Sequence, residues 1–146
     1  MASRSQLETL IDLARRETDD TAKRLGAALK AVEDCQQKLQ MLSDYRDDYA
    51  RRFEATMAAG ITPAAFRNFQ AFMGKLDNAI SGQQEVVRHA QRRSEMERAA
   101  WQLSERKRMS YTTLDNRAQE AELKLENKRD QKAMDEHAAR QAYYKR

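Results

Sequence analysis

One short segment of the chain has the sequence of a turn, and it separates two long stretches that are typical of helices. Gly60 is placed as the left-handed residue after a helix end, while Thr62 and Pro63 fit the N-cap and first residue of the next helix. The 146 residues contain only four glycines and one proline, which are too few for the turns of a sheet-based fold. The sequence predicts one helix over about residues 3–58, a turn over about 59–62 and a second helix over about 63–140.

Apolar side chains recur at alternating steps of three and four residues, which is the seven-residue repeat of a coiled coil. In the first predicted helix the ladder is Leu7, Ile11, Ala14, Thr18, Thr21, Leu25, Ala28, Val32, Cys35, Leu39, Leu42, Arg46, Tyr49, Phe53 and Thr56. In the second it is Phe66, Phe69, Met73, Leu76, Ile80, Gln83, Val87 and Ala90, and it fades at Ser94 and Glu97. A shifted ladder then follows at Ala100, Leu103, Lys107, Tyr111, Leu114, Ala118, Ala121 and Leu125. This shift predicts a local change of the supercoil.

Two long helices joined by a short turn must lie antiparallel. The predicted fold is therefore all-α, with two long helices forming an antiparallel coiled-coil hairpin over residues 1–146 as a single rod-like domain. Residue i should lie opposite about residue 123 − i in such a hairpin. The tail beyond about residue 121 then has no partner in the first helix, and alone it is marginal as a helix.

The predicted hairpin offers no enclosed cleft, so the sequence predicts no catalytic site, no cofactor site and no enzyme. Cys35 and His89 could approach each other across the hairpin, but two ligands do not form a zinc site, and we expect no metal. No apolar h-region is present at the N-terminus, which predicts no secretory signal. No uncharged apolar stretch approaches the length of about 18 residues that a membrane span needs. We therefore expect a cytoplasmic protein without direct membrane insertion.

The densest basic stretch lies in the second predicted helix, interleaved with glutamates. Its members are Arg88, Arg92, Arg93, Arg98, Arg106, Lys107 and Arg108. Such a row could neutralise phosphates, which leaves a nucleic-acid-binding coiled coil as one alternative. Intrahelical ion pairs on a solvated flank, or an acidic protein partner, explain the row better because Trp101 is the only aromatic side chain there that could stack on bases. We therefore expect no nucleic-acid partner.

Aromatic and apolar side chains gather on both helices near the predicted turn. Tyr45 and Tyr49 are four residues apart with Leu42 one turn earlier, and the hairpin brings them near a row formed by Phe72, Leu76, Ala79 and Gln83. The heptad ladder includes Leu42, Tyr49 and Leu76, whereas Tyr45 and Phe72 fall beside it. These two rings either pack on the flank of the seam or form a docking surface for a partner.

A series of short residue blocks runs along nearly the whole chain in a specific order and spacing: Leu7-Glu8-Thr9-Leu10, Asp12-Leu13-Ala14, Asp19-Asp20, Met41-Leu42, Asp44-Tyr45, Tyr49, Gly60-Ile61, Gln70, Phe72, Leu76, Ala79-Ile80, Trp101, Glu126-Asn127, Asp130-Gln131-Lys132 and Met134-Asp135-Glu136. In these blocks the chain resembles the FliJ family of small coiled-coil stalk proteins in bacterial flagellar type III export. Lys38 and Gln83 depart from the family pattern, and the closing Tyr143-Tyr144 is not part of it.

The resemblance implies a non-enzymatic stalk that inserts its paired terminal helices into a hexameric export ATPase ring and promotes assembly of that ring. It implies ATPase-ring contacts at Leu7, Leu10, Leu13, Arg129, Lys132, Met134, Asp135 and Glu136. It further implies contact with the cytoplasmic portion of the export gate membrane protein through Leu42, Tyr45, Tyr49, Phe72, Leu76 and Ala79. Export chaperones would be escorted, and the protein would lie at the cytoplasmic face of the inner membrane. An equivalent stalk of a virulence-type secretion system remains an alternative.

Overall fold

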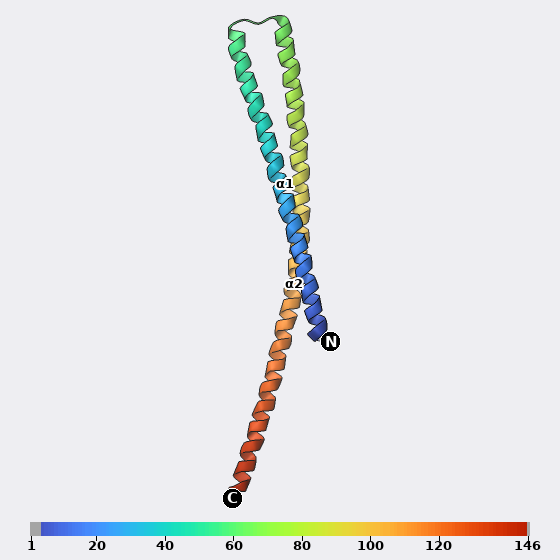
Figure 1. The fold of residues 1–146 in the computed structure, drawn as a ribbon, viewed down its shortest axis with the longest axis vertical. Helices are drawn as coiled ribbons and strands as arrows, with labels where there is room; N and C mark the ends of the chain where they lie inside the picture. The colour runs from blue at the N-terminus through green and yellow to red at the C-terminus, as the bar shows by residue number, and fades with distance from the viewer. Residues whose placement is uncertain (1–3, 146) are drawn as a thin grey trace. The chain divides into compact units, whose positions relative to one another are not determined.

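The computed structural model describes residues 4–145, and this range contains two α-helices and no strand. Helix α1 spans Arg4–Ala58 and helix α2 spans Pro63–Tyr144, joined by residues 59–62 (Figure 1). The predicted all-α hairpin of two long helices is confirmed. Helix α2 continues past the expected end near residue 140. Residue 3, where the first helix was expected to begin, lies outside the described residues.

The turn between the helices has the local chemistry that its sequence predicts. Gly60 has a φ of 93°, a left-handed conformation in which a Cβ atom is unfavourable. Its backbone N–H donates to the Met57 carbonyl at 3.0 Å, which satisfies one carbonyl at the end of α1. At the start of α2 the Thr62 hydroxyl accepts a hydrogen bond from the Ala65 N–H at 3.1 Å. Thr62 is therefore the N-cap of α2.

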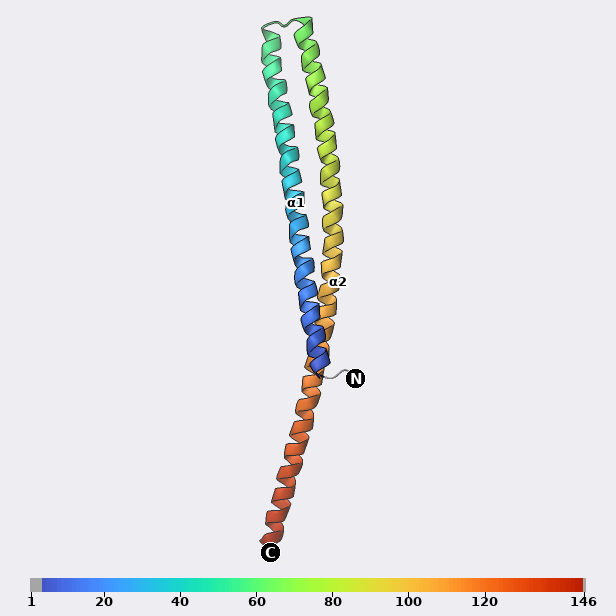
Figure 2. The same cartoon turned by 45° about the vertical axis from the view of Figure 1, so that its right-hand side comes forward.

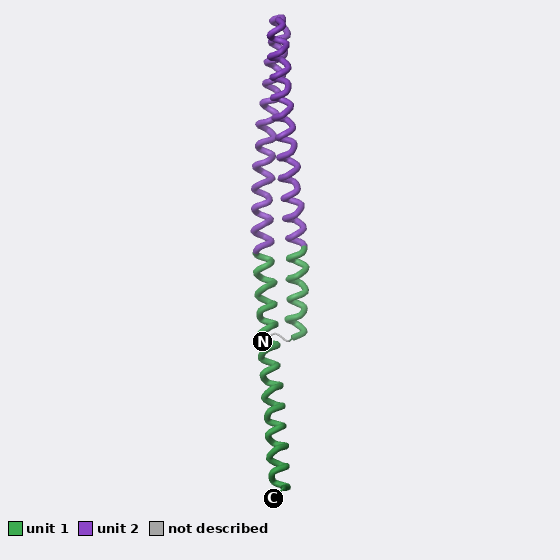
Figure 3. The backbone as a smooth tube through the Cα atoms, turned by 90° about the vertical axis from the view of Figure 1, so that its left-hand side faces the viewer, with its two compact units in different colours: residues 1–19, 103–146 green, residues 20–102 purple. Residues whose placement is uncertain are grey.

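The chain forms two compact units, each of which contains part of both helices (Figure 3). The terminal unit combines residues up to 19 with those from 103 onward, and the turn unit contains residues 20–102 with the connection between the helices. The expected single domain over residues 1–146 stays a prediction.

In the turn unit the two helices pack along the predicted heptad ladder, and α1 and α2 run alongside each other in the view of Figure 2. Ala28, Leu76 and Val87 are buried, whereas Thr56, the last predicted member of the α1 ladder, is exposed. Arg46 Nε donates to Asp77 Oδ1 at 2.5 Å, which places these residues opposite each other as the antiparallel hairpin predicts.

In the terminal unit the seam is small and partly polar. Ile11 and Ala14 are buried together with Thr18 and Ser104. The Thr18 hydroxyl donates to the Ala14 carbonyl at 2.9 Å, so this buried hydroxyl is satisfied within α1. The helices are also joined by ion pairs between Lys107 and Glu17 at 3.6 Å and between Arg4 and Glu122 at 3.3 Å.

The predicted phase shift in α2 is wrong. Leu103 and Leu114 are 68% and 51% exposed, and Lys107 and Ala118 are exposed as well. The original ladder instead continues without a break through buried or half-buried side chains: Ser94, Glu97, Trp101, Ser104, Arg108, Tyr111 and Asp115. Ala100, Glu105 and Thr112 are half-buried beside it.

The continuous ladder of α1 explains why α2 keeps its phase. A heptad seam without a slip in one helix requires a partner in the same phase. The part of α1 that faces this region buries Ala14, Thr18 and Thr21. Because these side chains are small or carry a hydroxyl group, the seam accommodates polar side chains from α2 opposite them. The spacing of apolar residues alone predicted the wrong face of α2 for the seam, because the face that packs against α1 in this region carries mostly polar side chains.

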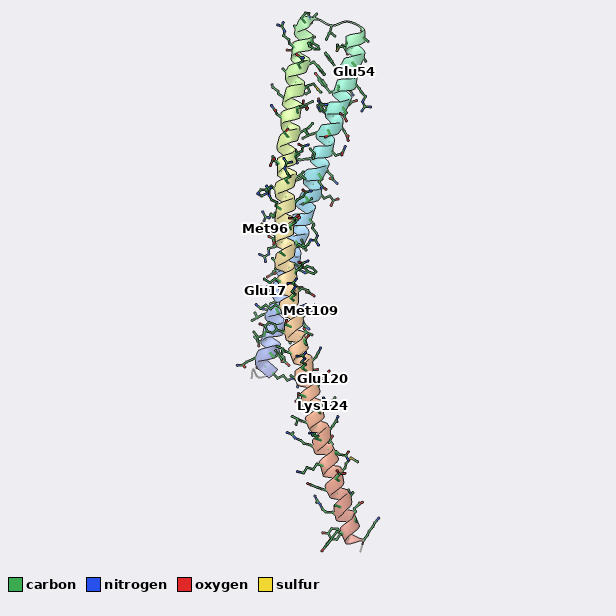
Figure 4. All side chains as sticks on the ribbon, turned by 180° about the vertical axis from the view of Figure 1, so that it is seen from behind. Glu17, Glu54, Met96, Met109, Glu120 and Lys124 are labelled. Atoms are coloured by element: carbon green, nitrogen blue, oxygen red, sulfur yellow. The ribbon has the colours of Figure 1, made fainter. Side chains whose placement is uncertain are left out.

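The last part of α2 extends beyond the contacts with α1. Arg4–Glu122 is the final cross-helix ion pair along α2 among residues 4–145, and every described side chain from residue 123 to 145 is exposed. Figure 4 shows the Lys124 side chain on this part of α2, beyond the first residues of α1. We call residues 123–145 the terminal extension. It is helical up to Tyr144 without packing against α1.

Candidate interaction surfaces

The first candidate surface, here called the tip patch, lies in the turn unit and consists of Leu42, Tyr45, Tyr49, Phe72, Leu76 and Ala79. The structure brings these predicted residues of α1 and α2 together but divides them by burial. Leu76 is only 8% exposed, and Leu42, Tyr49 and Phe72 are half-buried. Tyr45 is 52% exposed, and Ala79 is exposed too. The members available to a partner are therefore chiefly Tyr45, Ala79 and the outer part of Phe72.

Aromatic rings from both helices form a continuous cluster through the tip patch and toward the turn. Tyr49 contacts Phe72 with ring centroids 4.6 Å apart and Phe69 with centroids 5.5 Å apart. Phe53 stacks on Phe69 with parallel rings and a centroid separation of 3.5 Å. Tyr45 lies at the outer side, 6.3 Å from Phe72. Such ring pairs stabilise the hairpin beyond the area that they bury.

An ion pair flanks this cluster. The hydrogen bond from Arg46 to Asp77, followed by their mutual attraction, raises the pKa of the Arg46 guanidinium. Both side chains remain substantially exposed, so the pair fixes the register of the two helices more than it stabilises them.

The second candidate surface, here called the terminal surface, lies in the terminal unit and has two parts. On α1, Leu7 and Leu10 are half-buried, whereas Leu13 is 54% exposed. The other part lies on the terminal extension and consists of Arg129, Lys132, Met134, Asp135 and Glu136, all exposed. The two parts do not contact each other, because the last ion pair between α2 and α1 involves Glu122 and the terminal extension lies beyond it. A partner that touches both parts must itself cover the intervening stretch.

The basic stretch of α2 is partly neutralised by ion pairs. Arg88 pairs with Glu85, Arg108 pairs with Glu105, and Lys107 pairs with Glu17 across the hairpin. The hydrogen bond from Arg108 lowers the pKa of the Glu105 carboxyl, and the same bond raises the pKa of Arg108. Arg92, Arg93, Arg98 and Arg106 form no ion pair with any residue in the range 4–145, so the row is a paired flank only in part. The expectation of no nucleic-acid partner stays a prediction.

No group of three or more His, Cys, Asp or Glu side chains within residues 4–145 could hold a metal ion. Cys35 is a half-buried free thiol whose backbone carbonyl accepts a hydrogen bond from the Gln83 side-chain amide at 3.0 Å. Neither helix, as far as it is described, contains a window apolar enough to cross a bilayer.

Comparison with known proteins identifies the family. The model of the family described as "Flagellar FliJ protein" matches residues 3–146. The chain is 33% identical to the Flagellar FliJ protein of Escherichia coli (strain K12) over 145 residues, covering 99% of each chain. The Flagellar FliJ protein of Salmonella typhi matches with the same identity and coverage.

The chain belongs to the FliJ family. The resemblance inferred from residue blocks is thereby confirmed, and the protein is a component of bacterial flagellar protein export and flagellum biogenesis. Within this FliJ chain, the structure gives Gln83 a specific role. It ties α2 to the α1 backbone at Cys35, so the residue at this position helps to hold the hairpin together.

Sequence reasoning missed one surface of this FliJ chain, a groove between the helices in the turn unit. The groove has a volume of about 720 Å³. It is lined by Arg24, Ala27, Ala28, Ala31, Glu85, Val86, His89, Ala90, Arg92, Arg93 and Glu97. The sequence signal that could have revealed the groove is the cluster Ala27, Ala28 and Ala31 on α1. One heptad before and after Ala27 and Ala31, the equivalent positions carry larger side chains.

Proposed function

We propose that this chain is a non-enzymatic stalk and adaptor of the flagellar export apparatus. In this proposal the terminal surface engages a hexameric export ATPase ring and promotes its assembly. The tip patch contacts the cytoplasmic portion of the export gate membrane protein, and export chaperones are escorted. The protein works in the cytoplasm, peripherally at the cytoplasmic face of the inner membrane. Membership of the FliJ family supports a role in flagellar export. The two proposed contacts are supported by the tip patch and the terminal surface, which share no residue.

The observation that carries the ring contact is the terminal extension. Residues 123–145 expose all their side chains and remain helical to Tyr144. A single helix without a packing partner is marginal in water, so a segment of this kind gains most from binding another protein. Its exposed side chains include Met134, which is 68% exposed among charged neighbours. This combination fits a contact that is polar at its edges and has a single apolar anchor.

The symmetry of a ring also limits what this contact can be. A hexameric pore presents the same surface six times, whereas one hairpin has no sixfold symmetry to match it. The contact should therefore be small, polar and exchangeable among the six subunits. The mixed charges of Arg129, Lys132, Asp135 and Glu136 suit such a contact better than a large apolar interface would.

The test compares ATP hydrolysis by the purified export ATPase in the presence of the full chain and of a chain that ends after Leu125. The truncation removes Arg129 to Glu136 but none of the described cross-helix ion pairs. We expect the full chain to stimulate hydrolysis by promoting ring assembly, and the truncated chain to lose this effect while its hairpin still folds. Helical content and thermal unfolding check the fold. Equal stimulation by both chains would contradict a ring contact at the extension.

The matched control replaces Tyr143 and Tyr144 by serine. These rings are also exposed in the terminal extension and contact each other with centroids 5.8 Å apart, but they lie outside the proposed contact. The Tyr143→Ser, Tyr144→Ser chain should stimulate the ATPase like the unchanged chain. Loss of stimulation in this control would indicate that the ring contact lies at the end of α2, at Tyr143 and Tyr144. Retention of either chain on DNA with a steep salt dependence would instead favour the nucleic-acid alternative.

A further inference from the structure

The groove in the turn unit is a third surface that shares no residue with the tip patch or the terminal surface. Its floor is formed by small side chains from both helices. Ala28 is 5% exposed and Ala90 is half-buried, whereas Ala27, Ala31 and Val86 are open to solvent. The floor of the groove is therefore apolar and accessible from outside the hairpin. A groove of this kind between two helices can receive a third helix.

The heptad positions explain why the groove occurs where it does. Ala31 lies two heptads before Tyr45 on α1, and Val86 lies two heptads after Phe72 on α2, so each pair occupies the same flank of its helix. At the tip patch this flank is filled by two contacting rings. In the groove the same flank holds an alanine and a valine, and the space beside the seam stays open.

The charges around the groove do not cancel. Arg24 pairs with Glu97 at 3.8 Å, and Glu85 is paired with Arg88. Arg92 and Arg93 also line the groove and are exposed, but neither forms an ion pair or hydrogen bond to any residue in the described range 4–145. The rim therefore carries two positive charges that no carboxylate of the turn unit neutralises.

We propose that this groove docks one amphipathic α-helix of another protein, with large aliphatic side chains on one stripe and carboxylates beside it. Aliphatic side chains fill the space that the alanines leave, and the carboxylates pair with Arg92 and Arg93. The α2 part of the lining runs from Glu85 to Glu97, which is about 18 Å at 1.5 Å per residue. It therefore accommodates about three helical turns, with anchors at positions i, i+3 or i+4, and i+7.

A foreign helix fits the groove better than a second copy of this chain does. The helix without an α1 partner that a second copy could offer is its terminal extension, residues 123–145. This segment carries six basic and four acidic side chains, so Arg92 and Arg93 would meet excess positive charge. The proposal depends only on the groove and does not require the ring or gate contacts proposed above.

The test uses a designed peptide as the probe. It is a two-heptad helix, about 20 Å long at 1.5 Å per residue, with leucine along one stripe and glutamate beside it, held helical by a hydrocarbon staple on its outer face. A second peptide has lysine in place of each glutamate. Binding to the full chain is followed by fluorescence anisotropy. We expect saturable binding of the glutamate peptide, and at least tenfold weaker binding of the lysine peptide. Equal binding of both peptides, or no binding of either, would overturn the proposal.

Two variants with a matched charge change locate the binding site on the hairpin. Arg93→Glu changes the groove rim, whereas Arg98→Glu makes the same change at an exposed arginine outside the lining. Arg93→Glu should weaken binding of the glutamate peptide at least fivefold, and Arg98→Glu should change it less than twofold. Equal weakening by both variants would show a general charge effect and would overturn the assignment to the groove.

A third variant tests the apolar floor. Ala31 is exposed, so Ala31→Glu should fold normally, which circular dichroism and thermal unfolding verify. It should abolish binding of the glutamate peptide by placing a carboxylate inside the groove. Unchanged binding to a folded Ala31→Glu chain would overturn the proposal. Sedimentation of the unchanged chain adds one further outcome, because a stable dimer that the glutamate peptide dissociates would show that a second copy occupies the groove.

Discussion

The rings of Tyr49 and Phe72 come from different helices and lie with their centroids 4.6 Å apart. This contact means that Phe72 packs against the hairpin as well as facing outward. Substituting it would alter stability and binding together. The tip patch must therefore be tested with variants that separate its buried members from its exposed ones.

Leu76 represents the buried members of the tip patch. It is 8% exposed in the seam between the helices, so Leu76→Ala removes buried methyl groups and leaves a cavity. The free energy of unfolding should fall by about 2–3 kcal/mol, measured by urea denaturation followed by circular dichroism. A loss below about 0.5 kcal/mol, the range of ordinary surface substitutions, would show that the seam does not depend on Leu76.

Tyr45 represents the exposed members. Its ring lies more than 6 Å from those of Tyr49 and Phe72, so Tyr45→Ala should cost at most about 1 kcal/mol of stability. If the tip patch contacts the export gate, the same change should weaken binding to the purified cytoplasmic portion of the gate protein about tenfold or more, as loss of an aromatic anchor does. Tyr143→Ala, at another exposed tyrosine, is the matched control and should bind normally. Unchanged gate binding by Tyr45→Ala would remove this residue from the contact.

The sequence predicted the fold and the turn correctly because both depend on local chemistry. Gly60 and Thr62 have the conformation and cap contact that their residue types favour, and every member of the α1 ladder except Thr56 is buried or half-buried. The seam of α2 was mispredicted from Ala100 onward because its side chains include buried Ser104 and half-buried Arg108 and Asp115. Hydrophobic periodicity cannot identify a seam made of polar side chains, because whether a polar side chain is buried depends on which side chains of the partner helix lie opposite it.

The same reasoning applies to the candidate surfaces. Tyr45 and Phe72 could be identified beside the seam from their spacing alone. Their exposure could not, because it depends on ring contacts between the helices. The groove at Ala31 and Val86 was missed for a related reason: it consists of space that small side chains leave open, and a sequence pattern indicates which side chains are present without showing the gap between them.

Two glycines should respond to alanine in opposite directions. Gly60 has a φ of 93°, which an L-residue adopts at a cost of about 1–2 kcal/mol, so Gly60→Ala should destabilise the hairpin. Gly74 lies within α2, and an added Cβ would meet no atom within 4 Å. Gly74→Ala should therefore stabilise the hairpin by about 0.5–1 kcal/mol through higher helix propensity. Urea denaturation of the two variants side by side measures both effects, and the same sign for both would contradict this account.

The pair formed by Glu105 and Arg108 should be visible in a titration. The hydrogen bond from Arg108 holds the pKa of Glu105 below its ordinary value, so the carboxylate stays ionised to lower pH in the folded chain. The stability that the pair contributes is therefore present above the ordinary pKa of glutamate and is lost as the pH falls through the folded-state value. Carbon-detected NMR of the Glu105 carboxyl measures its pKa. It should rise in Arg108→Gln, and an unchanged value would show that the pair does not form in solution.

Salt should separate the proposed ring contact from the folding of the hairpin. The terminal extension is exposed and charged, and interactions between exposed charges are screened over about 8 Å at physiological ionic strength. Binding of the full chain to the assembled ATPase ring should therefore weaken as sodium chloride rises from 50 to 500 mM, whereas its thermal unfolding should change little because most of the seam is uncharged. Lys132→Gln should weaken binding at low salt and reduce the salt dependence. Lys145→Gln changes the same charge at an exposed lysine outside the proposed contact and should leave both unchanged. Binding that is insensitive to salt would indicate an apolar interface, and the proposed polar contact with the ring would then be wrong.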